Sequence, residues 1–569
     1  MKTALVERIM SGTLPSGVAV VLKGSEKYND NVTYLLAPWL KYSPDGILYP
    51  ENATQVEMAV KWAAQRDLTI SIAGGRHGGA GYCNSGSYSL DLSKMKEIGP
   101  LDEEAGTLRV SAGVLLGEII DFLGERGHVA ATGVCPTVGA PGWALGGGYS
   151  PLSKMLGLGC DNVVAFNVVS ADGTSVVANE TSNPELFWAL RGAGGNSFGV
   201  ITSMIIKVEK LASMVYYTLT APLETDPDFA AAVMYRWQTL YFKNKTWTES
   251  ALSTYSARFG RLQLEGPMVL NFELVYVSDG PNAVDEARNL LAPLTDFVLK
   301  HPESLVSDDF KVVPFREVTI FDDLFTDPLF ALAPFIEAKL SLYLKRDMQL
   351  EDWRVIIAAM LSYLDLEAAN PLLIGQYFVF EPYAGKVSDG KMSDTTAHFQ
   401  RGETLGDLYF DVFVKQEANE DESKKGYDAA TKWLSSLHTG KPPRLGNTLY
   451  LYNGMFQSYV NYAQPLYGQG VNRWPALLNY YGGNLCELVR IKKMVDPHLR
   501  FDHPQGIPVH VPDDYDCNPA EASVVSIAIF SAACSLFTIF VVIIAAILKR
   551  KPGKKKNAKS AALEMAELG

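Results

Sequence analysis

Hydrophobic and polar residues in the first 210 positions alternate between helical and extended spacing. Residues 54–64 predict a helix, because apolar side chains recur at helical spacing from Val56 to Ala64 and Thr54 pairs with Glu57 as a capping box. Short stretches rich in β-branched residues predict strands at 68–72, 89–93, 107–113, 162–173 and 198–208. This order of elements indicates a mixed fold of the α+β class.

The pattern changes in the middle of the chain. Residues 270–277 alternate apolar and polar positions, and an amphipathic helical pattern follows from about Asn282. We therefore expect a second domain, built as a sheet with helices on one face. A chain of 569 residues is also too long for one core and suggests two or three packed units.

The stretch 522–548 contains no charged residue and is long enough to predict a transmembrane helix. Basic residues are dense in 549–556, so the positive-inside rule predicts a single-pass protein with a cytosolic tail and an extracellular or lumenal body. The N-terminal sequence lacks the apolar core of a signal peptide, which leaves open a missing N-terminal segment or tail anchoring with a cytosolic body. Sequons that favour a glycoprotein occur at Asn31, Asn52, Asn179 and Asn244.

Net charge and ligand-type residues exclude two classes of partner. A net charge of -13 argues against nucleic acid, because binding phosphates needs clustered lysine and arginine. The six cysteines and eight histidines show no zinc-site spacing, so we expect no metal centre, and the cysteines form no disulfide framework.

Glycine is concentrated in three segments, residues 73–81, 133–148 and 190–199. Glycine allows the backbone to approach a ligand and to adopt positive φ, so these segments suit a large cofactor with a pyrophosphate. None of them matches the dinucleotide GxGxxG or the P-loop pattern. On glycine content alone, ordinary tight turns are an equal alternative.

Several motifs in a fixed order resemble the berberine bridge enzyme branch of the vanillyl alcohol oxidase superfamily, which has a PCMH-type FAD-binding domain. Between residues 45 and 210 they are ILYPENATQVEMAVKWA, GGRHGGAGY, LDLSKM, VSAGVLLGEI, GVCPTVGAPGWALGGGYSPLSKMLGLGCDNV and PELFWALRGAGGNSFGVIT. The resemblance resumes with YVNY at 459–462 and NYYGGNLCELVRIKKMVDPHLRFDHPQGIP at 479–508. It is faint in the middle domain.

The resemblance implies an FAD-binding domain made of two parts. The PCMH-type part is expected at 40–212, and an inserted substrate domain of antiparallel sheet at 213–440. A C-terminal segment at 441–515 completes the FAD domain, before the transmembrane helix at 522–548 and the basic tail at 549–569.

In this family the histidine of the first glycine segment bonds to the 8α-methyl group of FAD, and the cysteine of CPTVG bonds to ring carbon 6; here these are His77 and Cys135. Imidazole and thiolate are nucleophiles, so both fit attachment to an electrophilic flavin. Arg76 departs from the family pattern by displacing a glycine. The other implied cofactor residues are Gly74, Gly75, Arg76, Gly78, Gly79, Gly133, Pro136, Thr137, Val138, Gly139, Gly142, Gly146, Gly147, Gly148, Val200 and Asn484.

A protein base takes a proton when a flavin takes a hydride. By resemblance, Tyr459 and Tyr462 lie close to the flavin, and either is a catalytic candidate if nearby cations or hydrogen bonds lower its pKa. Residues 397–414 resemble a degraded form of a family segment with substrate-specific residues. Read as a strand, it places Tyr409 and Asp411 on one face, where Asp411 is either a carboxylate base or a solvated strand residue.

These residues predict an FAD-dependent oxidase that takes a hydride from a hydroxyl- or amine-bearing carbon of a sugar or secondary metabolite and reduces O₂ to H₂O₂. A dehydrogenase with another electron acceptor is the nearest alternative. A membrane-displayed binding protein that kept the fold and lost catalysis is the alternative from another class. The nucleophiles His77 and Cys135 argue against it.

Overall fold

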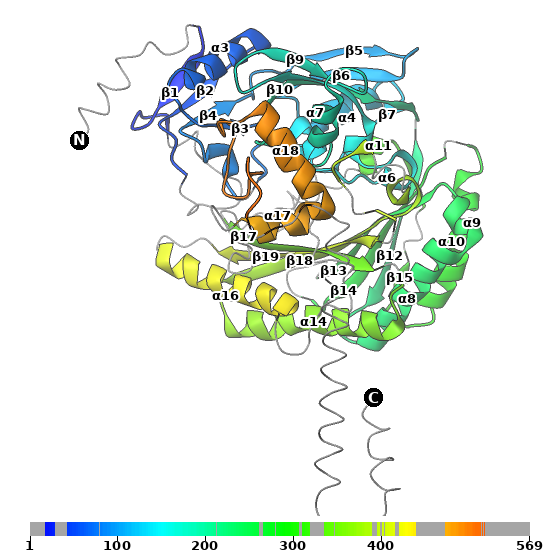
Figure 1. The fold of residues 1–569 in the computed structure, drawn as a ribbon. Coiled ribbons are helices and arrows are strands. Elements are labelled where there is room, and N and C mark those ends of the chain that lie inside the picture. The colour runs from blue at the N-terminus through cyan, green and yellow to red at the C-terminus, as the bar shows by residue number, and fades with distance from the viewer. Residues whose placement is uncertain are drawn as a thin grey trace, which may run out of the picture. The chain divides into compact units, whose positions relative to one another are not determined.

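The computed structural model describes residues 17–28, 42–78, 80–211, 213–260, 266–278, 280–306, 310–318, 335–345, 347–389, 395–398, 401–402, 404–415, 420–439, 473–513, 515 and 517 (Figure 1). The chain divides into two compact units, Met1–Val511 and Pro512–Gly569. The helices and strands given below belong to the first unit.

A four-stranded sheet begins the fold. Its strands are β1 (Ala19–Leu22), β2 (Gly46–Tyr49), β3 (Ile70–Ala73) and β4 (Tyr88–Asp91), in the order β1-β2-β4-β3. β2, β4 and β3 run parallel, whereas β1 pairs with β2 in the antiparallel sense. The helix α3 (Ala53–Ala64) joins β2 to β3, and its apolar side chains pack on this sheet.

The predicted helix is confirmed, but its predicted capping box is wrong. Asn52 is the N-cap, and its side-chain oxygen accepts a hydrogen bond of 3.0 Å from the backbone N–H of Gln55. Glu57 instead accepts a hydrogen bond from the Ser175 hydroxyl. The helix therefore begins before Thr54, at Ala53.

A five-stranded antiparallel sheet follows, in the order β5-β6-β10-β8-β9. Its strands are β5 (Ile98–Asp102), β6 (Thr107–Ser111), β8 (Val163–Val169), β9 (Ser175–Ala178) and β10 (Val200–Lys207). The five predicted strands are thus confirmed as β3, β4, β6, β8 and β10. The short strands β7 (His128–Val129) and β11 (Glu209–Lys210) pair with each other.

Short helices connect these strands. They are η1 (Tyr82–Asn84), α4 (Leu116–Gly124), α5 (Ala140–Leu145), α6 (Ser153–Leu156), η2 (Gly159–Asn162) and α7 (Pro184–Leu190).

An eight-stranded antiparallel sheet forms the middle of the chain. Its strands are β12 (Met214–Pro222), β13 (Leu252–Gly260), β14 (Val269–Tyr276), β15 (Leu305–Val306), β16 (Lys311–Val313), β17 (Phe335–Lys345), β18 (Leu373–Pro382) and β19 (Thr404–Lys415). The order is β15-β12-β14-β13-β18-β19-β17, and β16 pairs with β12. Short helices α9 (Lys245–Glu249), α11 (Phe315–Val318) and η3 (Gly385–Ser388) lie in its connections.

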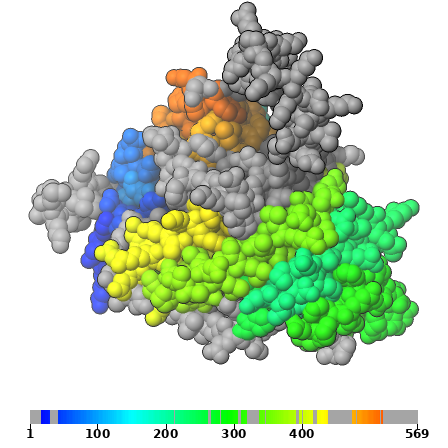
Figure 2. All heavy atoms as spheres, turned by 90° about the horizontal axis from the view of Figure 1, so that it is seen from below, coloured from blue at the N-terminus to red at the C-terminus, as the bar shows by residue number. Residues whose placement is uncertain are grey.

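Four long helices cover one face of this sheet, as the sequence predicts. They are α8 (Pro227–Lys243), α10 (Ala283–Val298), α14 (Leu350–Ala369) and α16 (Glu420–Thr439). Figure 2 shows α16, α14 and α8 side by side across this face. In β19 the apolar Phe410 packs against Trp433 of α16, so the alternate residues Tyr409 and Asp411 lie on the opposite face, which we call the inner face.

The C-terminal part of the first unit returns to the N-terminal sheet (Figure 1). It consists of α17 (Trp474–Tyr481), η6 (Gly482–Asn484), α18 (Leu485–Val495) and the residues after them. The buried Lys492 amine pairs with Asp496 at 2.7 Å and donates a hydrogen bond to the Ser197 carbonyl. The Arg500 carbonyl accepts a hydrogen bond of 2.8 Å from Ile70, at the start of β3.

The expectation of a single-pass membrane protein is corrected. In the part of the chain that the structure describes, no helix is long and apolar enough to cross a membrane. The longest helices there, α14 and α16, carry charged residues along their length and pack on a sheet. Residues 522–548 and the basic tail at 549–569 lie outside the described residues. The transmembrane helix, the localisation inferred from it and the expectation of a glycoprotein are without support.

Candidate active site

The first two glycine segments touch through their backbones. We call residues 73–81, 133–148 and 190–199 the first, second and third glycine loops. A Cβ on Gly75 would stand 2.3 Å from the Gly139 nitrogen, and a Cβ on Gly139 would stand 2.5 Å from the Gly75 nitrogen. Because nonbonded atoms do not approach this closely, only glycine fits at either position.

The second glycine loop is also fixed to the start of α4. Leu116 and Gly117 donate backbone hydrogen bonds of 2.9 and 3.0 Å to the carbonyls of Val138 and Pro136. N–H groups in the first turn of a helix have no partner within the helix. The loop therefore satisfies the helix end, and the helix holds the loop in place.

The third glycine loop joins the other two. Gly192 and Gly194 donate hydrogen bonds of 3.1 and 2.8 Å to the Leu145 carbonyl of the second loop. The Asn196 side-chain oxygen accepts a hydrogen bond of 2.6 Å from Ile72 in β3, directly before the first loop. The three loops therefore converge on one region.

The two predicted attachment residues meet where the first and second loops touch. The sulfur of Cys135 lies 4.0 Å from Nε2 of His77. The Thr137 hydroxyl contacts both, at 3.6 Å from the sulfur and 2.7 Å from Nε2. The 8α-methyl group and ring carbon 6 lie along one edge of a flavin ring, so adjacent nucleophiles suit both positions.

Burial sets the protonation state of both nucleophiles. It lowers the pKa of His77 to about 4, so the imidazole is neutral and nucleophilic at pH 7. Burial raises the pKa of the Cys135 thiol, whose proton must leave before the sulfur can react. The neutral imidazole is close enough to take that proton.

Arg76, which departs from the family pattern, has a backbone conformation that favours glycine. Its φ is 58°, in the left-handed region. Its guanidinium forms an ion pair of 2.5 Å with the buried Asp91 at the end of β4. This pair holds the residue that precedes His77. Among the described residues, Nη1 of Arg76 is buried without a hydrogen-bond partner, and it is available to a cofactor.

Two glycines predicted to contact the cofactor also make room for Trp143. A Cβ on Gly133 would stand 2.9 Å from the indole nitrogen, and a Cβ on Gly148 would stand 2.6 Å from the indole ring. Gly159 in η2 abuts the far edge of the same ring. These glycines therefore leave space for the Trp143 ring, which packs against the second loop.

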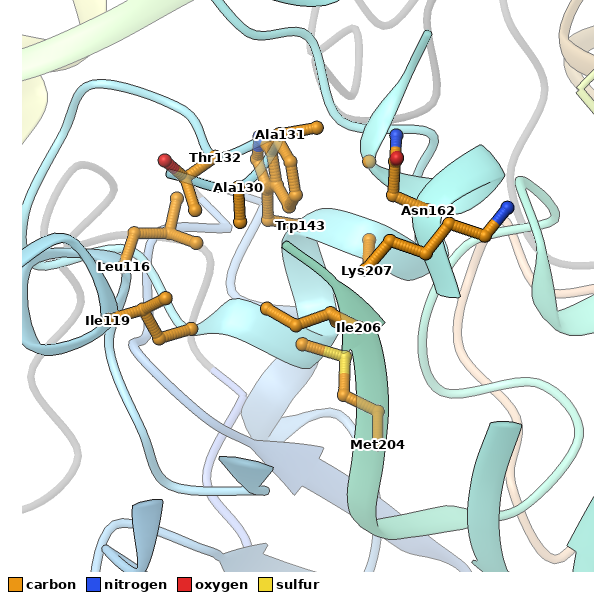
Figure 3. Close-up of a pocket in the computed structure, with 12 residues that line it drawn as sticks. Leu116, Ile119, Ala130, Ala131, Thr132, Trp143, Asn162, Met204, Ile206 and Lys207 are labelled. Atoms are coloured by element: carbon orange, nitrogen blue, oxygen red, sulfur yellow. The ribbon is translucent and has the colours of Figure 1, made fainter. Parts of the chain in front are cut away.

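A small cavity lies beside Trp143 (Figure 3). Apolar side chains from α4 and β10 and the hydroxyl of Thr132 line it. Its volume of about 10 Å³ has room for one water molecule at most, so it is not a flavin site. The Thr132 hydroxyl is buried and has no partner among the described residues, which suits a single bound water.

Five other predicted glycines fall into two groups. A Cβ on Gly74, Gly78 or Gly142 would meet no atom within 4 Å. Gly146 and Gly147 end α5, and the Gly147 carbonyl accepts a hydrogen bond of 2.9 Å from Cys160.

The remaining predicted residues are more scattered. Val200 lies in the core at the start of β10, and the Asn484 amide donates a hydrogen bond of 3.0 Å to the Ala397 carbonyl. Gly79 of the first loop and the tyrosines Tyr459 and Tyr462 lie outside the described residues.

The inner face of the eight-stranded sheet holds Asp411 in a buried cluster of charges. Nζ of Lys339 lies 3.2 Å from Asp411 Oδ2 and 3.2 Å from Glu337 Oε1. Lys339 in β17 and Asp411 in β19 are direct cross-strand partners. The Asp411 side chain is only 6% exposed, so its interpretation as a solvated strand residue is wrong.

This cluster lies near the first glycine loop, since the charges of Glu337 and Lys339 both act on the pKa of His77. Tyr409 is on the same face, and the Lys339 amine lies 5.3 Å from the centre of its ring. Oδ1 of Asp411 is buried and has no hydrogen-bond partner among the described residues. That oxygen is available to a donor on a ligand.

A buried ion pair ties the segment before β19 to η2, which follows the second loop. Arg401 donates hydrogen bonds of 2.9 and 2.7 Å to the two carboxylate oxygens of Asp161, in η2. Ala397 donates a hydrogen bond of 2.9 Å to the Arg191 carbonyl of the third loop. The segment therefore joins the glycine loops to the sheet that carries Asp411.

Sequence reasoning missed three residues of this region. Glu337 and Lys339 lie two positions apart in FIEAKLSLYLK, so the alternation of the strand places both on one face, which was the available signal. Asn84 in η1 was also missed. It is 1% exposed, and neither atom of its amide has a hydrogen-bond partner among the described residues.

The residues of this junction fit FAD. The reciprocal contact of Gly75 and Gly139 keeps side chains away from the backbone where the loops meet, which suits close approach of a pyrophosphate. The orphaned polar atoms of Asn84 and Arg76 suit hydrogen bonds from a ligand, because buried polar groups are rarely left unpaired. The neutral imidazole of His77 suits attachment.

Comparisons with known proteins agree with this fit. Residues 44–179 match the family described as "FAD binding domain", and residues 458–508 match "Berberine and berberine like". The chain is 27% identical over 503 residues to the uncharacterized FAD-linked oxidoreductase YgaK of Bacillus subtilis (strain 168), covering 86% of this chain and 96% of that protein.

Two further relatives are named for carbohydrate substrates. The carbohydrate oxidase of Microdochium nivale is 26% identical over 517 residues, covering 86% of this chain and 93% of that protein. The xylooligosaccharide oxidase of Thermothelomyces thermophilus is 27% identical over 493 residues, covering 82% and 88%. Among solved structures, wild-type BBE-like 1 of Physcomitrella patens has the same fold, with a TM-score of 0.68 at 21% identity over 90% of this chain and 99% of that one.

The fold and the family matches define an FAD-dependent oxidoreductase. More narrowly, the chain resembles the berberine bridge enzyme-like FAD-linked oxidoreductases, because the match to the FAD-binding domain near its start and the berberine-like match near its end occur together. The alternative of a binding protein without catalysis is therefore dropped, since the relatives that span the chain are oxidoreductases.

Proposed function

We propose that this protein is an oxidase that takes a hydride from a hydroxyl-bearing carbon of a carbohydrate and reduces O₂ to H₂O₂. FAD, when bound, supplies the hydride acceptor. The observation that carries the proposal is the buried carboxylate of Asp411, which lies near the first glycine loop and has one oxygen available to a ligand.

The glycine loops are the proposed cofactor site. Their backbones hold the pyrophosphate, and His77 and Cys135 carry the covalent links to the flavin ring. The support is the 4.0 Å distance between the two nucleophiles and the shared contact with Thr137, which orients both. Asn84 of η1 and Arg76 of the first loop are the proposed hydrogen-bond donors to the cofactor beside these loops.

Asp411 is the proposed base for the substrate hydroxyl. Oδ2 stays paired with Lys339, and Oδ1 accepts the hydroxyl proton. Burial raises the pKa of Asp411 well above its usual range, so its carboxylate is a stronger base than an exposed aspartate. Tyr459 and Tyr462 remain predicted contributors.

A carbohydrate suits the rest of the inner face. Arg258 in β13 pairs with Glu273 in β14 at 2.9 Å, and the Arg258 guanidinium lies 5.2 Å from the centre of the Tyr377 ring in β18. Polar groups beside an aromatic ring match a ligand that has many hydroxyls and apolar ring faces. The two carbohydrate-oxidising relatives point to the same substrate class.

The test is a substrate screen on the purified holoenzyme. Glucose, lactose and a series of xylooligosaccharides are mixed with the enzyme, and loss of flavin absorbance without oxygen is followed beside peroxide formation in air. If the enzyme is an oxidase, its flavin absorbance is lost with at least one sugar, and peroxide forms with that sugar in air. Bleaching without peroxide supports the dehydrogenase alternative, and no bleaching with any sugar contradicts the carbohydrate proposal.

A further inference from the structure

The cluster around Asp411 has one more negative group than positive groups. Glu337 and Asp411 both lie 3.2 Å from the one amine of Lys339, which brings their carboxyl groups close together. The three side chains are 6%, 6% and 13% exposed. Two adjacent carboxylates cannot both ionise easily when buried, so such a pair tends to keep one proton.

Neighbouring elements do not supply a second cation to the cluster among the described residues. Arg258 is paired with Glu273, and the imidazole of His77 is neutral because burial lowers its pKa to about 4. The other titratable groups that interact with the cluster or its neighbours are Arg258 of β13, Glu273 of β14, Tyr377 of β18, Asp407 and Tyr409 of β19, Tyr427 of α16 and His77 of the first loop.

We propose that Glu337, Lys339 and Asp411 form one unit that holds a single proton near neutral pH, in which Glu337 and Lys339 are positioning residues for Asp411. The inference rests on the proposed function of Asp411 as the base. Lys339 holds the two carboxyl groups on either side of its amine, across β17 and β19. Glu337 competes with Asp411 for the proton.

The proton balance follows from the three charges. With the shared proton the unit has no net charge, and without it the net charge is −1. Only the proton-free unit can accept the hydroxyl proton of the substrate, while the hydride leaves the same carbon for the flavin. Each turnover restores the proton to the unit, which then releases it to water.

This arrangement fixes the direction of the pH dependence. Burial, and after it the like charge of Glu337, raise the pKa of Asp411, and Lys339 opposes them. kcat/KM is therefore at its maximum above this raised pKa and falls as the pH drops through it. Glu337→Gln removes the like charge and moves the acidic limb to lower pH by roughly one unit or more, whereas Lys339→Met moves it to higher pH.

The experiment is an infrared pH titration of the substrate-free holoenzyme, which needs no substrate. The carboxyl band that titrates in the wild type is expected to titrate at lower pH in Glu337→Gln and at its original pH in Lys339→Arg, which keeps the cation. An unshifted band in Glu337→Gln would overturn the shared proton. Equal flavin content across the variants shows that each is folded.

Turnover of Asp411→Asn separates this inference from the proposed function. If the band moves as expected but Asp411→Asn keeps wild-type kcat with a sugar that bleaches the flavin, the unit exists and Asp411 is not the base. If Asp411→Asn loses turnover but the acidic limb of kcat/KM is unchanged in Glu337→Gln, Asp411 acts alone and the inference fails.

Discussion

The two sides of the candidate site are built from different material. On the cofactor side, the glycine loops meet through bare backbone, as at Gly75 and Gly139. On the substrate side, the inner face of the sheet brings buried charges together through side chains, as at Lys339 and Asp411. Close backbone packing defines the cofactor side, and buried charged side chains define the substrate side.

This difference predicts two kinds of variant. An added methyl group on the cofactor side has no space and displaces a loop. A neutral isostere on the substrate side fits the same space and changes only the proton chemistry. A neutral isostere on the substrate side that also released the flavin would contradict this distinction between the two sides.

Asp411→Asn is expected to have the largest effect. Loss of the base should lower kcat by roughly 10²- to 10⁴-fold, with flavin content unchanged. Steady-state kinetics with a sugar from the screen measures it. Asp407→Asn is the matched control, because Asp407 is a buried carboxylate of β19 that bonds Ser341 instead of Lys339. A similar loss in both variants would contradict a specific role for Asp411.

Loss of the buried ion pair between Arg401 and Asp161 is expected to have the second largest effect. Arg401→Met leaves Asp161 buried without its partner, which costs about 3–5 kcal/mol. The thermal unfolding midpoint is expected to fall clearly. Arg490→Met is the control, because the exposed pairs of Arg490 with Glu185 and Glu487 contribute only about 0–1 kcal/mol. Equal thermal unfolding midpoints for the two variants would contradict a stabilising role of the Arg401–Asp161 ion pair.

Gly75→Ala tests the backbone contact on the cofactor side. The new Cβ would stand 2.3 Å from the Gly139 nitrogen, and overpacking of this kind costs about 1–3 kcal/mol. The variant should lose flavin, measured as the ratio of flavin to protein absorbance. Gly124→Ala, with no atom within 4 Å of the new Cβ, should keep wild-type flavin content. Full flavin content in Gly75→Ala would show that the loops have room to separate.

Thr137→Val gives the smallest predicted effect. It removes the hydroxyl 2.7 Å from His77, a hydrogen bond worth about 0.5–1.5 kcal/mol. Attachment of added FAD to flavin-free protein should slow by roughly two- to tenfold. Thr132→Val removes a hydroxyl without a partner among the described residues and should leave that rate unchanged.

Local motifs revealed the cofactor side better than the substrate side. The GGRHGG and CPTVG motifs named His77 and Cys135, and folding brings these two within 4.0 Å. The packing of Gly133 and Gly148 on Trp143 depends on tertiary contacts and was invisible in a linear motif.

On the substrate side, Asp411 was found, but its partners were not. Glu337 and Lys339 lie on another strand, and only the β17–β19 register brings them to Asp411. The bonding of Cys486 and Cys517 in disulfides was also missed, because spacing alone shows no pairing. The membrane prediction rested on the uncharged stretch 522–548 and on the basic residues after it, without packing information.

Acid precipitation tests the central claim, that flavin is held where His77 and Cys135 meet, most directly. Wild-type protein and the variants His77→Ala, Cys135→Ala and the double variant are precipitated, washed and measured for flavin absorbance and mass. The account predicts that flavin stays with the wild-type pellet, survives each single variant through the remaining bond, and is released from the double variant. Flavin in the wild-type supernatant would contradict covalent attachment, and flavin retained in the double-variant pellet would place the attachment elsewhere.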